Sequence, residues 1–231
     1  MTFITPHYNK AKKQSPIGFF KKDHYLVKTP WWLKKLFPGC LWDIKTKDKT
    51  LYLSFDDGPH PVITPYVLKL LKQYNAKATF FCIGENVQNY PEVYQQIINE
   101  GHATGNHTHN HINGWKTADN DYMQNIYAAG KFISSGLFRP PYGRIKRSQI
   151  RLLKQEQPEM KIVMWNILAG DWVTELEPEK CYKRIKGKIS NGDIIVFHDT
   201  DKAFPRLEYA LPKILSHFTE ASYHFEKIED N

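Results

Sequence analysis

One stretch of the chain, residues 51–59, reads Leu51-Tyr52-Leu53-Ser54-Phe55-Asp56-Asp57-Gly58-Pro59. It joins a short apolar run to two adjacent carboxylates and a Gly-Pro turn. Such a run is typical of a buried strand that delivers its last residues to the rim of a sheet. Two neighbouring carboxylates repel each other, so keeping both ionised requires a cation, either a metal ion or an arginine. An isolated Asp-Asp-Gly is more often a solvated turn, and the rest of the sequence has to separate these two interpretations.

The composition is typical of a soluble globular protein, with 41% hydrophobic and 24% charged residues in a chain of 231. This length suits one sizeable α/β domain. No apolar run reaches the ~18 residues of a membrane-spanning helix, and the N-terminus lacks the apolar core of a signal peptide. The sequence alone therefore predicts a cytoplasmic protein. Three isolated cysteines, Cys40, Cys82 and Cys181, predict buried thiols rather than disulfides or a zinc–thiolate site.

The positive charge is concentrated at the N-terminus. Residues 1–50 hold eleven lysines and three aspartates, a net charge of +8 that equals the formal charge of the whole chain. We therefore divide the chain into a basic N-terminal arm, 1–50, and a main domain, 51–231. Because the domain is balanced, its charge does not indicate nucleic-acid binding. Residues 1–25 are expected to be a poorly ordered leader, with peripheral contact to an anionic envelope or membrane surface as the alternative.

Within the arm, Pro30 and Pro38 bracket a short amphipathic segment. Proline suits the start of a helix and cannot continue one, so the spacing predicts about two helical turns. The apolar residues of the segment are Trp31, Leu33, Leu36 and Phe37. We expect this helix to pack over the bottom of the main domain, and a foot on a membrane surface is the alternative.

From residue 51 onward, strand-like and helix-like segments alternate. The predicted strands are 51–55, 78–83, 102–106, 137–139, 161–167, 193–197 and 223–228. The predicted helices are 65–74, 91–100, 119–134, 146–155, 178–189 and 207–218. Repeated βα units imply a parallel sheet, and about seven strands predict a barrel short of the full eight. The fold class is therefore α/β.

The residues that could do chemistry follow the ends of these strands, where βα barrels build their active sites. They are Asp56-Asp57, His107–His111, Arg139–Gly143, Asp171-Trp172 and His198-Asp199. The H-x3-H spacing of His107 and His111 brings two imidazoles together, and Asp57 would complete a two-histidine, one-carboxylate metal set with open positions. Each cluster alone is an ordinary surface feature, but five clusters on one rim indicate a site.

These motifs, in this order, resemble the five motifs of the polysaccharide deacetylase family, also called the NodB homology or carbohydrate esterase family 4 group. They read Ser-Phe-Asp-Asp-Gly-Pro at 54–59, His-Thr-His-Asn-His at 107–111, Arg-Pro-Pro-Tyr-Gly at 139–143, Asp-Trp at 171–172 and Val-Phe-His at 196–198. The resemblance runs from about residue 51 to residue 228. It implies a distorted, incomplete (β/α) barrel and an enzyme that removes acetyl groups from N-acetylated sugars of peptidoglycan or chitin type. It also implies action at the cell envelope, although no export signal is visible.

The resemblance assigns Asp57, His107 and His111 to one divalent metal ion, with Zn²⁺ expected and Co²⁺, Mn²⁺ or Ni²⁺ as alternatives. A metal lowers the pKa of a water that it binds toward ~7, so that a hydroxide-like nucleophile is available near neutral pH. Asp56 would be the base that takes the proton from the attacking water. His198 would be the acid that protonates the departing sugar amine.

The other motif residues would support these roles. By the same resemblance, Arg139 would pair with Asp56 and keep it ionised, and Asp171 would orient His198 and raise its pKa. The backbone N–H of Tyr142 would bind the oxyanion. The oxyanion- and substrate-binding residues would be Pro141, Tyr142, Trp172 and Val196, with Trp115 as a further aromatic face for a sugar ring.

The chain departs from the family pattern at three positions. Ser54 stands where Thr is frequent, Leu168 where many relatives have Asp, and Val196 where Leu is usual. Leu168 bears on the environment of His198 and on substrate preference. Two other functions stay open: de-O-acetylation of an acetylated xylan-type glycan, and a non-catalytic glycan- or envelope-binding module. The intact Asp56 and His198 argue against the binding module, which needs neither a base nor an acid.

Overall fold

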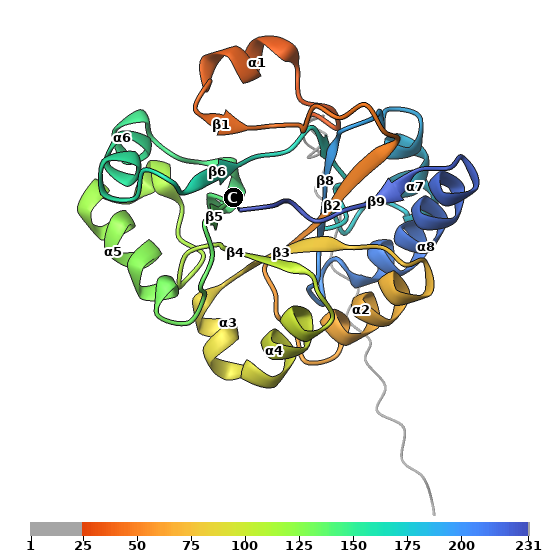
Figure 1. The fold of residues 1–231 in the computed structure, drawn as a ribbon, viewed down its shortest axis with the longest axis horizontal. Helices are drawn as coiled ribbons and strands as arrows, with labels where there is room; N and C mark the ends of the chain where they lie inside the picture. Colours follow the sequence, from red (N-terminus) through yellow and green to blue (C-terminus); the bar gives the residue numbers. More distant parts are fainter. Residues whose placement is uncertain (1–24, 231) are drawn as a thin grey trace, which may run out of the picture.

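The computed structural model describes residues 25–230 (Figure 1). The leader expected at residues 1–25 therefore lies, except for Tyr25, outside the described residues. One sheet curls into an open barrel, and most of the helices form a ring around it (Figure 1). Within the described part of the chain, no helix is both long enough and apolar enough to cross a membrane.

Nine strands of the described chain form one sheet, in the order β1-β6-β5-β4-β3-β2-β8-β7, with β9 pairing with β2 as well. The pairs are parallel throughout. The strands are β1 (Cys40–Leu41), β2 (Thr50–Asp56), β3 (Ala78–Cys82), β4 (Ala103–Asn106), β5 (Leu137–Phe138), β6 (Lys161–Val163), β7 (Ile167–Leu168), β8 (Ile194–His198) and β9 (His224–Phe225). This confirms the α/β class and the incomplete barrel, with two more strands than the seven expected.

The helices connect these strands on the outside of the sheet. They are α1 (Trp31–Leu36), α2 (Ile63–Gln73), α3 (Gly84–Asn89), α4 (Pro91–Asn99), α5 (Asp119–Gly130), α6 (Arg147–Glu156), α7 (Pro178–Lys186) and α8 (Phe204–Glu220), with the 3₁₀ turns η1 (Gly114–Lys116) and η2 (Pro141–Gly143). Pro91 and Pro178 begin α4 and α7, as the sequence predicted. Proline suits this position because its φ is already helical and its missing N–H has no partner in the first turn.

β2 runs through the centre of the sheet, between β3 and β8. Strand alternation points Leu51, Leu53 and Phe55 outward into the core that β2 shares with α2 and α8, and all three are fully buried. Phe55 stacks between Phe80 and Phe197 of the two neighbouring strands, at centroid distances of 5.0 and 6.2 Å. The even-numbered residues of β2 therefore point into the barrel. Asp56, the first of the two motif carboxylates, is the last of these residues.

The segment before β2 closes part of the gap in the barrel. β1 pairs with β6, and the N–H of Met164 donates to the carbonyl of Leu41 at 2.7 Å. Farther on, Asp43 forms an antiparallel bridge with Asp193, just before β8. The described part of the basic arm is thus joined to the sheet by backbone hydrogen bonds. The division of the chain at residue 50 stays a prediction.

The strand expected at 161–167 is two strands in the structure. β6 ends at Val163 beside β5, whereas β7 begins at Ile167 beside β8. The carbonyls of Val163 and Met164, where the chain leaves β6, accept hydrogen bonds from the side chain of Arg139 at 3.2 and 3.0 Å. The prediction of one strand was wrong because it ran through Asn166, the one polar residue at the break.

Three short elements also differ from the prediction. β1 and α3 were not predicted, because segments of two and six residues show no clear periodicity. The strand expected at 223–228 is reduced to β9, of which Phe225 is buried in the core beneath β2. The packing of each short segment against the barrel decides its conformation more than its own residues do.

α1 lies within the predicted segment 30–38 but packs differently from the expectation. It contains no buried residue. Leu33 is only half-buried, and Trp31, Trp32 and Leu36 are exposed. Figure 1 shows α1 outside the ring of the other helices, beyond β1. The expected packing over the domain therefore involves one side of the helix only.

Gly105, in β4, is a position where the fold leaves no room for a side chain. An added Cβ would lie 2.4 Å from the ring of Phe81 on the neighbouring strand. We predict that Gly105→Ala lowers the free energy of unfolding by about 1–3 kcal/mol, the usual cost of overpacking a core. Gly187→Ala is the control, since nothing lies within 4 Å of an added Cβ there. Urea denaturation measures both variants, and equal midpoints would contradict the prediction.

Candidate active site

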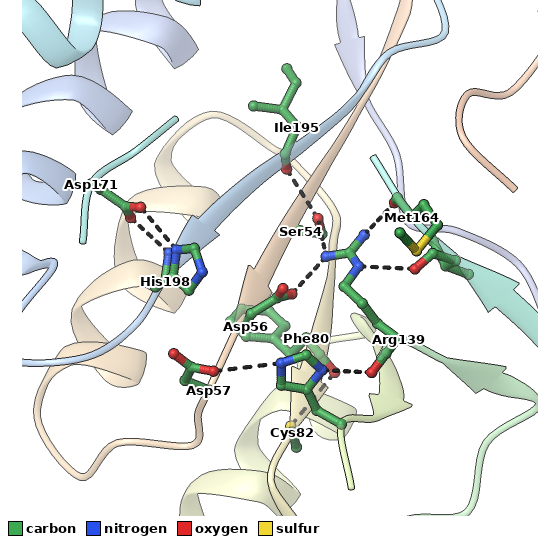
Figure 2. A network of polar contacts seen from close by, with 12 residues as sticks. Ser54, Asp56, Asp57, Phe80, Cys82, Arg139, Met164, Asp171, Ile195 and His198 are labelled. Carbon is green, nitrogen blue, oxygen red and sulfur yellow. Dashed lines mark hydrogen bonds and ion pairs between the residues drawn. The ribbon is translucent and has the colours of Figure 1, made fainter. Parts of the chain in front are cut away.

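Asp56 and Asp57 follow one another but have different partners. Asp56 is the last residue of β2, and only 4% of it is exposed. Asp57 lies in the turn that follows, with a φ of 78°. This left-handed conformation is unfavourable for a residue with a side chain, so the rest of the site must hold it. Figure 2 shows Asp56 directed at Arg139. Asp57 instead faces the imidazole of His107.

His107 and His111 come from the loop after β4. The Nδ1 atom of His107 lies 2.7 Å from the backbone carbonyl of Arg139. Because a carbonyl can only accept, Nδ1 carries the proton and Nε2 keeps its lone pair. This Nε2 is 3.5 Å from Oδ1 of Asp57, and Nε2 of His111 is 3.0 Å from the same oxygen. Two imidazole nitrogens and one carboxylate oxygen therefore converge.

A divalent metal ion fits this arrangement. The three ligand atoms of Asp57, His107 and His111 lie within 4.8 Å of one another. Oδ1 of Asp57 is buried and accepts no hydrogen bond from the described residues, which is costly unless a cation faces it. Burial acts to raise the pKa of Asp57, but nearby positive charge, including that of His198, holds it well below its usual value. An ionised carboxylate and two imidazoles form the ligand set of a catalytic metal site with open positions.

Arg139 holds Asp56 from inside the barrel. Its side chain is fully buried, and Nη1 donates to Oδ1 of Asp56 at 2.6 Å and to Oγ of Ser54 at 2.8 Å. The guanidinium also lies over the ring of Phe81, 3.9 Å from its centroid. Burial lowers the pKa of Arg139, and the charge of Asp56 opposes that shift. Since removing one partner of a buried ion pair costs about 3–5 kcal/mol, this contact fixes the carboxylate in place.

His198 and Asp171 form a second pair, and Figure 2 shows them on the opposite side of Asp56 from Arg139. Nδ1 of His198 is 2.9 Å from Oδ1 of Asp171, whose Oδ2 accepts from the backbone N–H of His198 at 2.7 Å. Trp172 packs against the imidazole, with ring centroids 4.9 Å apart. Burial by itself lowers the pKa of His198, but the Asp171 carboxylate outweighs it and raises this pKa to about 9. His198 is therefore an imidazolium at neutral pH.

The metal set, the base and the imidazolium open into one cavity of about 390 Å³. Its motif residues are Asp56, Asp57, His107, His111, Tyr142, Trp172 and His198. The ring of Tyr142 packs against that of His111, with centroids 4.5 Å apart. Arg139 and Asp171 are fully buried behind the wall. One concave space thus presents a cation site, a carboxylate and a proton donor to whatever enters it.

Known proteins share this combination of fold and motifs. The family model described as polysaccharide deacetylase matches residues 43–157. A peptidoglycan-N-acetylglucosamine deacetylase of Bacillus cereus is 33% identical over 194 residues, which cover 82% of this chain and 91% of that protein. The chain belongs to the polysaccharide deacetylase family. This confirms the family and the enzyme class that the motifs indicated.

Two further relatives of this polysaccharide deacetylase cover most of its length. A chitooligosaccharide deacetylase of Azorhizobium caulinodans is 32% identical over 68% of this chain and 76% of that protein. A solved structure of a peptidoglycan N-acetylglucosamine deacetylase, in complex with a naphthalenyl N-oxidanyl-benzamide, superimposes with a TM-score of 0.78. It is 28% identical and covers 87% of this chain and 95% of that one. The curled sheet described above is therefore the fold of this family.

Leu168, which the sequence analysis linked to substrate preference, also lines the cavity of this deacetylase. Five further lining residues had no predicted role: Tyr25, Arg144, Trp165, Thr200 and Lys202. The ring of Tyr25 lies 5.1 Å from that of Trp172, so the arm forms part of the wall. Arg144 and Thr200 directly follow motif residues, and this adjacency is the one feature of the sequence that could have indicated that they line the cavity. Nothing in the local sequence marks Tyr25 or Trp165, because the tertiary fold alone brings them to the cavity.

Some predicted residues lie away from the cavity. Pro141 and Val196 are buried, and neither is among the residues that line it. Trp115 lines a neighbouring cavity. His109, between the two metal-set histidines in sequence, stacks on Phe132 with ring centroids 5.7 Å apart. The contacts of Pro141 and Val196 with a substrate stay predictions.

Asp199, next to His198, supports the turn beneath the site. Its Oδ2 accepts a hydrogen bond from Thr64 of α2, and its backbone N–H donates to the carbonyl of Asp56 at 3.3 Å. An added Cβ on Gly58 would lie 2.3 Å from the same Oδ2, so only glycine fits the turn there. Burial raises the pKa of Asp199 to about 7. The sequence identified this carboxyl only as a neighbour of the motif histidine.

The His198–Asp171 pair predicts a measurable titration. In metal-free protein, Asp171→Asn should lower the pKa of His198 from about 9 to its ordinary value or below, because burial then acts without the facing carboxylate. NMR titration of the imidazole resonances measures this. A pKa raised in the folded state adds stability that is full below the unfolded value and is lost as the pH rises through the folded value. Wild type should therefore lose stability between pH 6.5 and about 9, and the variant should not.

His102 is the internal control for this titration. Burial lowers its pKa to about 4, and it should titrate identically in both proteins. The variant must also keep the backbone hydrogen bond to His198, which asparagine can still accept through its own side-chain oxygen. An Asp171→Asn variant in which His198 titrates as in the wild type would contradict the assignment of Asp171 as the group that keeps it protonated.

Proposed function

We propose that this protein is a metal-dependent hydrolase that removes acetyl groups from N-acetylglucosamine residues of a peptidoglycan- or chitin-type polysaccharide. The observation that carries this proposal is the position of Asp56, held by Arg139, and of His198, held by Asp171, around one metal-ligand set. Amide hydrolysis needs a base for the water and an acid for the amine. The names of the relatives, deacetylases of peptidoglycan and of chitooligosaccharides, support this class of substrate.

A divalent ion held by Asp57, His107 and His111 would polarise the acetamide carbonyl and lower the pKa of the attacking water. Zn²⁺ is the proposed ion, because two imidazoles and one carboxylate are the ligands of catalytic zinc sites that keep a position open. Co²⁺, Mn²⁺ and Ni²⁺ are the alternatives, since metals of this row bind the same nitrogen and oxygen donors. Elemental analysis of the purified protein distinguishes them.

Asp56 takes one proton from the attacking water in the proposed reaction. Arg139 binds its Oδ1, which leaves Oδ2 to accept the proton. The water oxygen forms a bond to the acetamide carbon, and the carbonyl π electrons move to the carbonyl oxygen. The backbone N–H of Tyr142, on the rim of the same cavity, binds the resulting negative charge.

His198 donates the second proton, to the sugar nitrogen, as the C–N bond breaks. The products are a free amino sugar and acetic acid, which keeps the second hydrogen of the water and then ionises to acetate. Transfer of the proton from Asp56 to His198 restores the carboxylate and the imidazolium. Asp171 keeps the imidazole protonated until this step and fixes its orientation. Trp172, beside the imidazole, offers an apolar surface to the acetyl methyl group.

We predict that the purified protein releases acetate from N-acetylglucosamine oligomers or from peptidoglycan. Activity should disappear with a chelator and return with Zn²⁺ or Co²⁺, because the attacking water is then activated again. Acetylated xylan, assayed in parallel, separates N-deacetylation from O-deacetylation. Inactivity of the metal-loaded protein on all three substrates would contradict the proposed function.

A substitution separates the base from the metal ligands. Asp56→Asn should lower kcat by about 10²–10⁴-fold and leave the metal content unchanged, because the base is lost and the three ligands remain. Asp57→Asn should lower both kcat and the metal content, because a metal ligand is lost. Asp201→Asn is the matched control, since that side chain is 91% exposed, and it should retain wild-type activity. An Asp56→Asn variant as active as Asp201→Asn would contradict the role of Asp56. If the protein were a non-catalytic binding module, neither substitution would change its binding to the glycan.

A further inference from the structure

α1 presents an unusual surface for a soluble protein. Its residues Trp31, Trp32, Lys35 and Leu36, here called the α1 face, are all exposed. The exposed fractions of the three apolar side chains are 69%, 50% and 48% in that order. The Nζ of Lys35 lies 4.8 Å from the centroid of the Trp31 ring, so the cation and the aromatic side chain share one side of the helix. Contiguous exposed aromatic residues of this kind mark an interaction surface.

The opposite side of this helix contacts the rest of the protein. Leu33 and Phe37, four residues apart, line a cavity of about 420 Å³. Lys34, between them, is paired with Asp43. Because these contacts fix the orientation of α1, the two tryptophans of the α1 face cannot turn inward without breaking them. The exposed face is therefore available to a partner.

Positive charge surrounds the α1 face. α1 contains no acidic residue. Arg147, at the start of α6, donates to the carbonyl of Leu36 at 3.4 Å and lies 6.0 Å from the ring of Phe37. Arg151 follows one turn later on α6, and both arginines are exposed. The complementary partner is therefore anionic.

We propose that the α1 face docks this protein on the surface of an anionic lipid bilayer. Tryptophan and leucine side chains partition into the interfacial region, where the indole ring is apolar and its N–H remains hydrated. Lys35, Arg147 and Arg151 would then lie at the level of the lipid phosphates. No part of this proposal depends on the deacetylase reaction.

The chemistry of the α1 face favours a bilayer over a glycan. The six side chains of α1 include two indoles and two ammonium groups but no hydrogen-bond acceptor for a sugar hydroxyl. The face is also the outer side of a helix, whereas sugars are bound in concave sites with several polar partners. A membrane surface needs neither a cleft nor directed hydrogen bonds.

Docking through α1 would place the active site close to the bilayer. The cavity behind Leu33 and Phe37 also touches Tyr142, Trp165 and Leu168. These three residues line the catalytic cavity as well. The width of one cavity therefore separates the inner side of α1 from the catalytic cavity, and docking would present the site to substrates near the membrane.

Sedimentation with vesicles tests the proposal on the chain of 231 residues. We expect wild type to bind phosphatidylglycerol vesicles and not phosphatidylcholine vesicles, with affinity falling as salt rises. Trp31→Ser/Trp32→Ser should raise the lipid concentration for half-binding by at least about tenfold, because two interfacial side chains are removed. Arg147→Glu/Arg151→Glu should weaken binding to anionic vesicles in the same assay.

Two matched controls remove the same kinds of side chain elsewhere. Val62→Ser/Ile98→Ser removes apolar residues that are 68% and 41% exposed. Lys69→Glu/Lys72→Glu reverses two exposed charges on α2. Both should bind vesicles as the wild type does. Thermal unfolding of each variant verifies its fold, and quenching of wild-type tryptophan fluorescence by bromo-lipids tests insertion without any substitution.

Several results would overturn the proposal. Wild type that does not sediment with anionic vesicles contradicts it directly. Equal binding by wild type and Trp31→Ser/Trp32→Ser would show that the face takes no part. A dimer in light scattering that this variant abolishes would assign the face to a second copy of the chain. If Trp31→Ser/Trp32→Ser lost binding to insoluble peptidoglycan but still bound vesicles, the α1 face would be assigned to a glycan.

Discussion

The ion pair between Arg139 and Asp56 is the interaction on which the rest of the site depends. A fully buried guanidinium is unfavourable unless every donor is satisfied, and here Nη1, Nε and Nη2 find two side-chain oxygens and two carbonyls. Those acceptors lie on β2 and at the end of β6, while Arg139 itself follows β5. The same residue accepts from His107 through its backbone carbonyl. One side chain and its peptide unit thus align the base, one metal-set histidine and three strands.

The site keeps a base and an acid apart by giving each its own partner. Asp56 bonds to a guanidinium on one side of the site, and His198 bonds to a carboxylate on the other. Direct contact between Asp56 and His198 would let the imidazolium pass its proton to the carboxylate, and the proposed base and acid would both be lost. Arg139 and Asp171 are both fully buried, so water does not screen either pair. In the proposed reaction, this separation would allow one cavity to carry out both proton transfers.

The N-terminal segment, residues 25–50, packs against the barrel and carries α1 on its outer side. β1 pairs with β6 and Asp43 bridges to Asp193 just before β8, so this segment spans part of the gap between the two ends of the open sheet. Tyr25 adds to the wall of the catalytic cavity. Because α1 is held between these contacts, its outer face has a fixed orientation relative to the active site. The described residues of the arm are therefore joined to the barrel, and Tyr25 reaches the wall of the site.

The sequence by itself determined the βα alternation, the parallel sheet and the order of the motif residues, because periodicity and strand-end chemistry are local properties of the chain. It was sufficient to bring Asp57, His107 and His111 together as one candidate set. The break between β6 and β7, the wall formed by Tyr25 and Trp165, and the exposure of Trp31 and Trp32 were decided only by the tertiary structure. These features depend on contacts such as that of the Tyr25 hydroxyl with the carbonyl of Ala169, 144 residues away. The pKa of His198 likewise depends on tertiary contacts, because burial lowers it and the carboxylate of Asp171, 27 residues away, raises it to about 9.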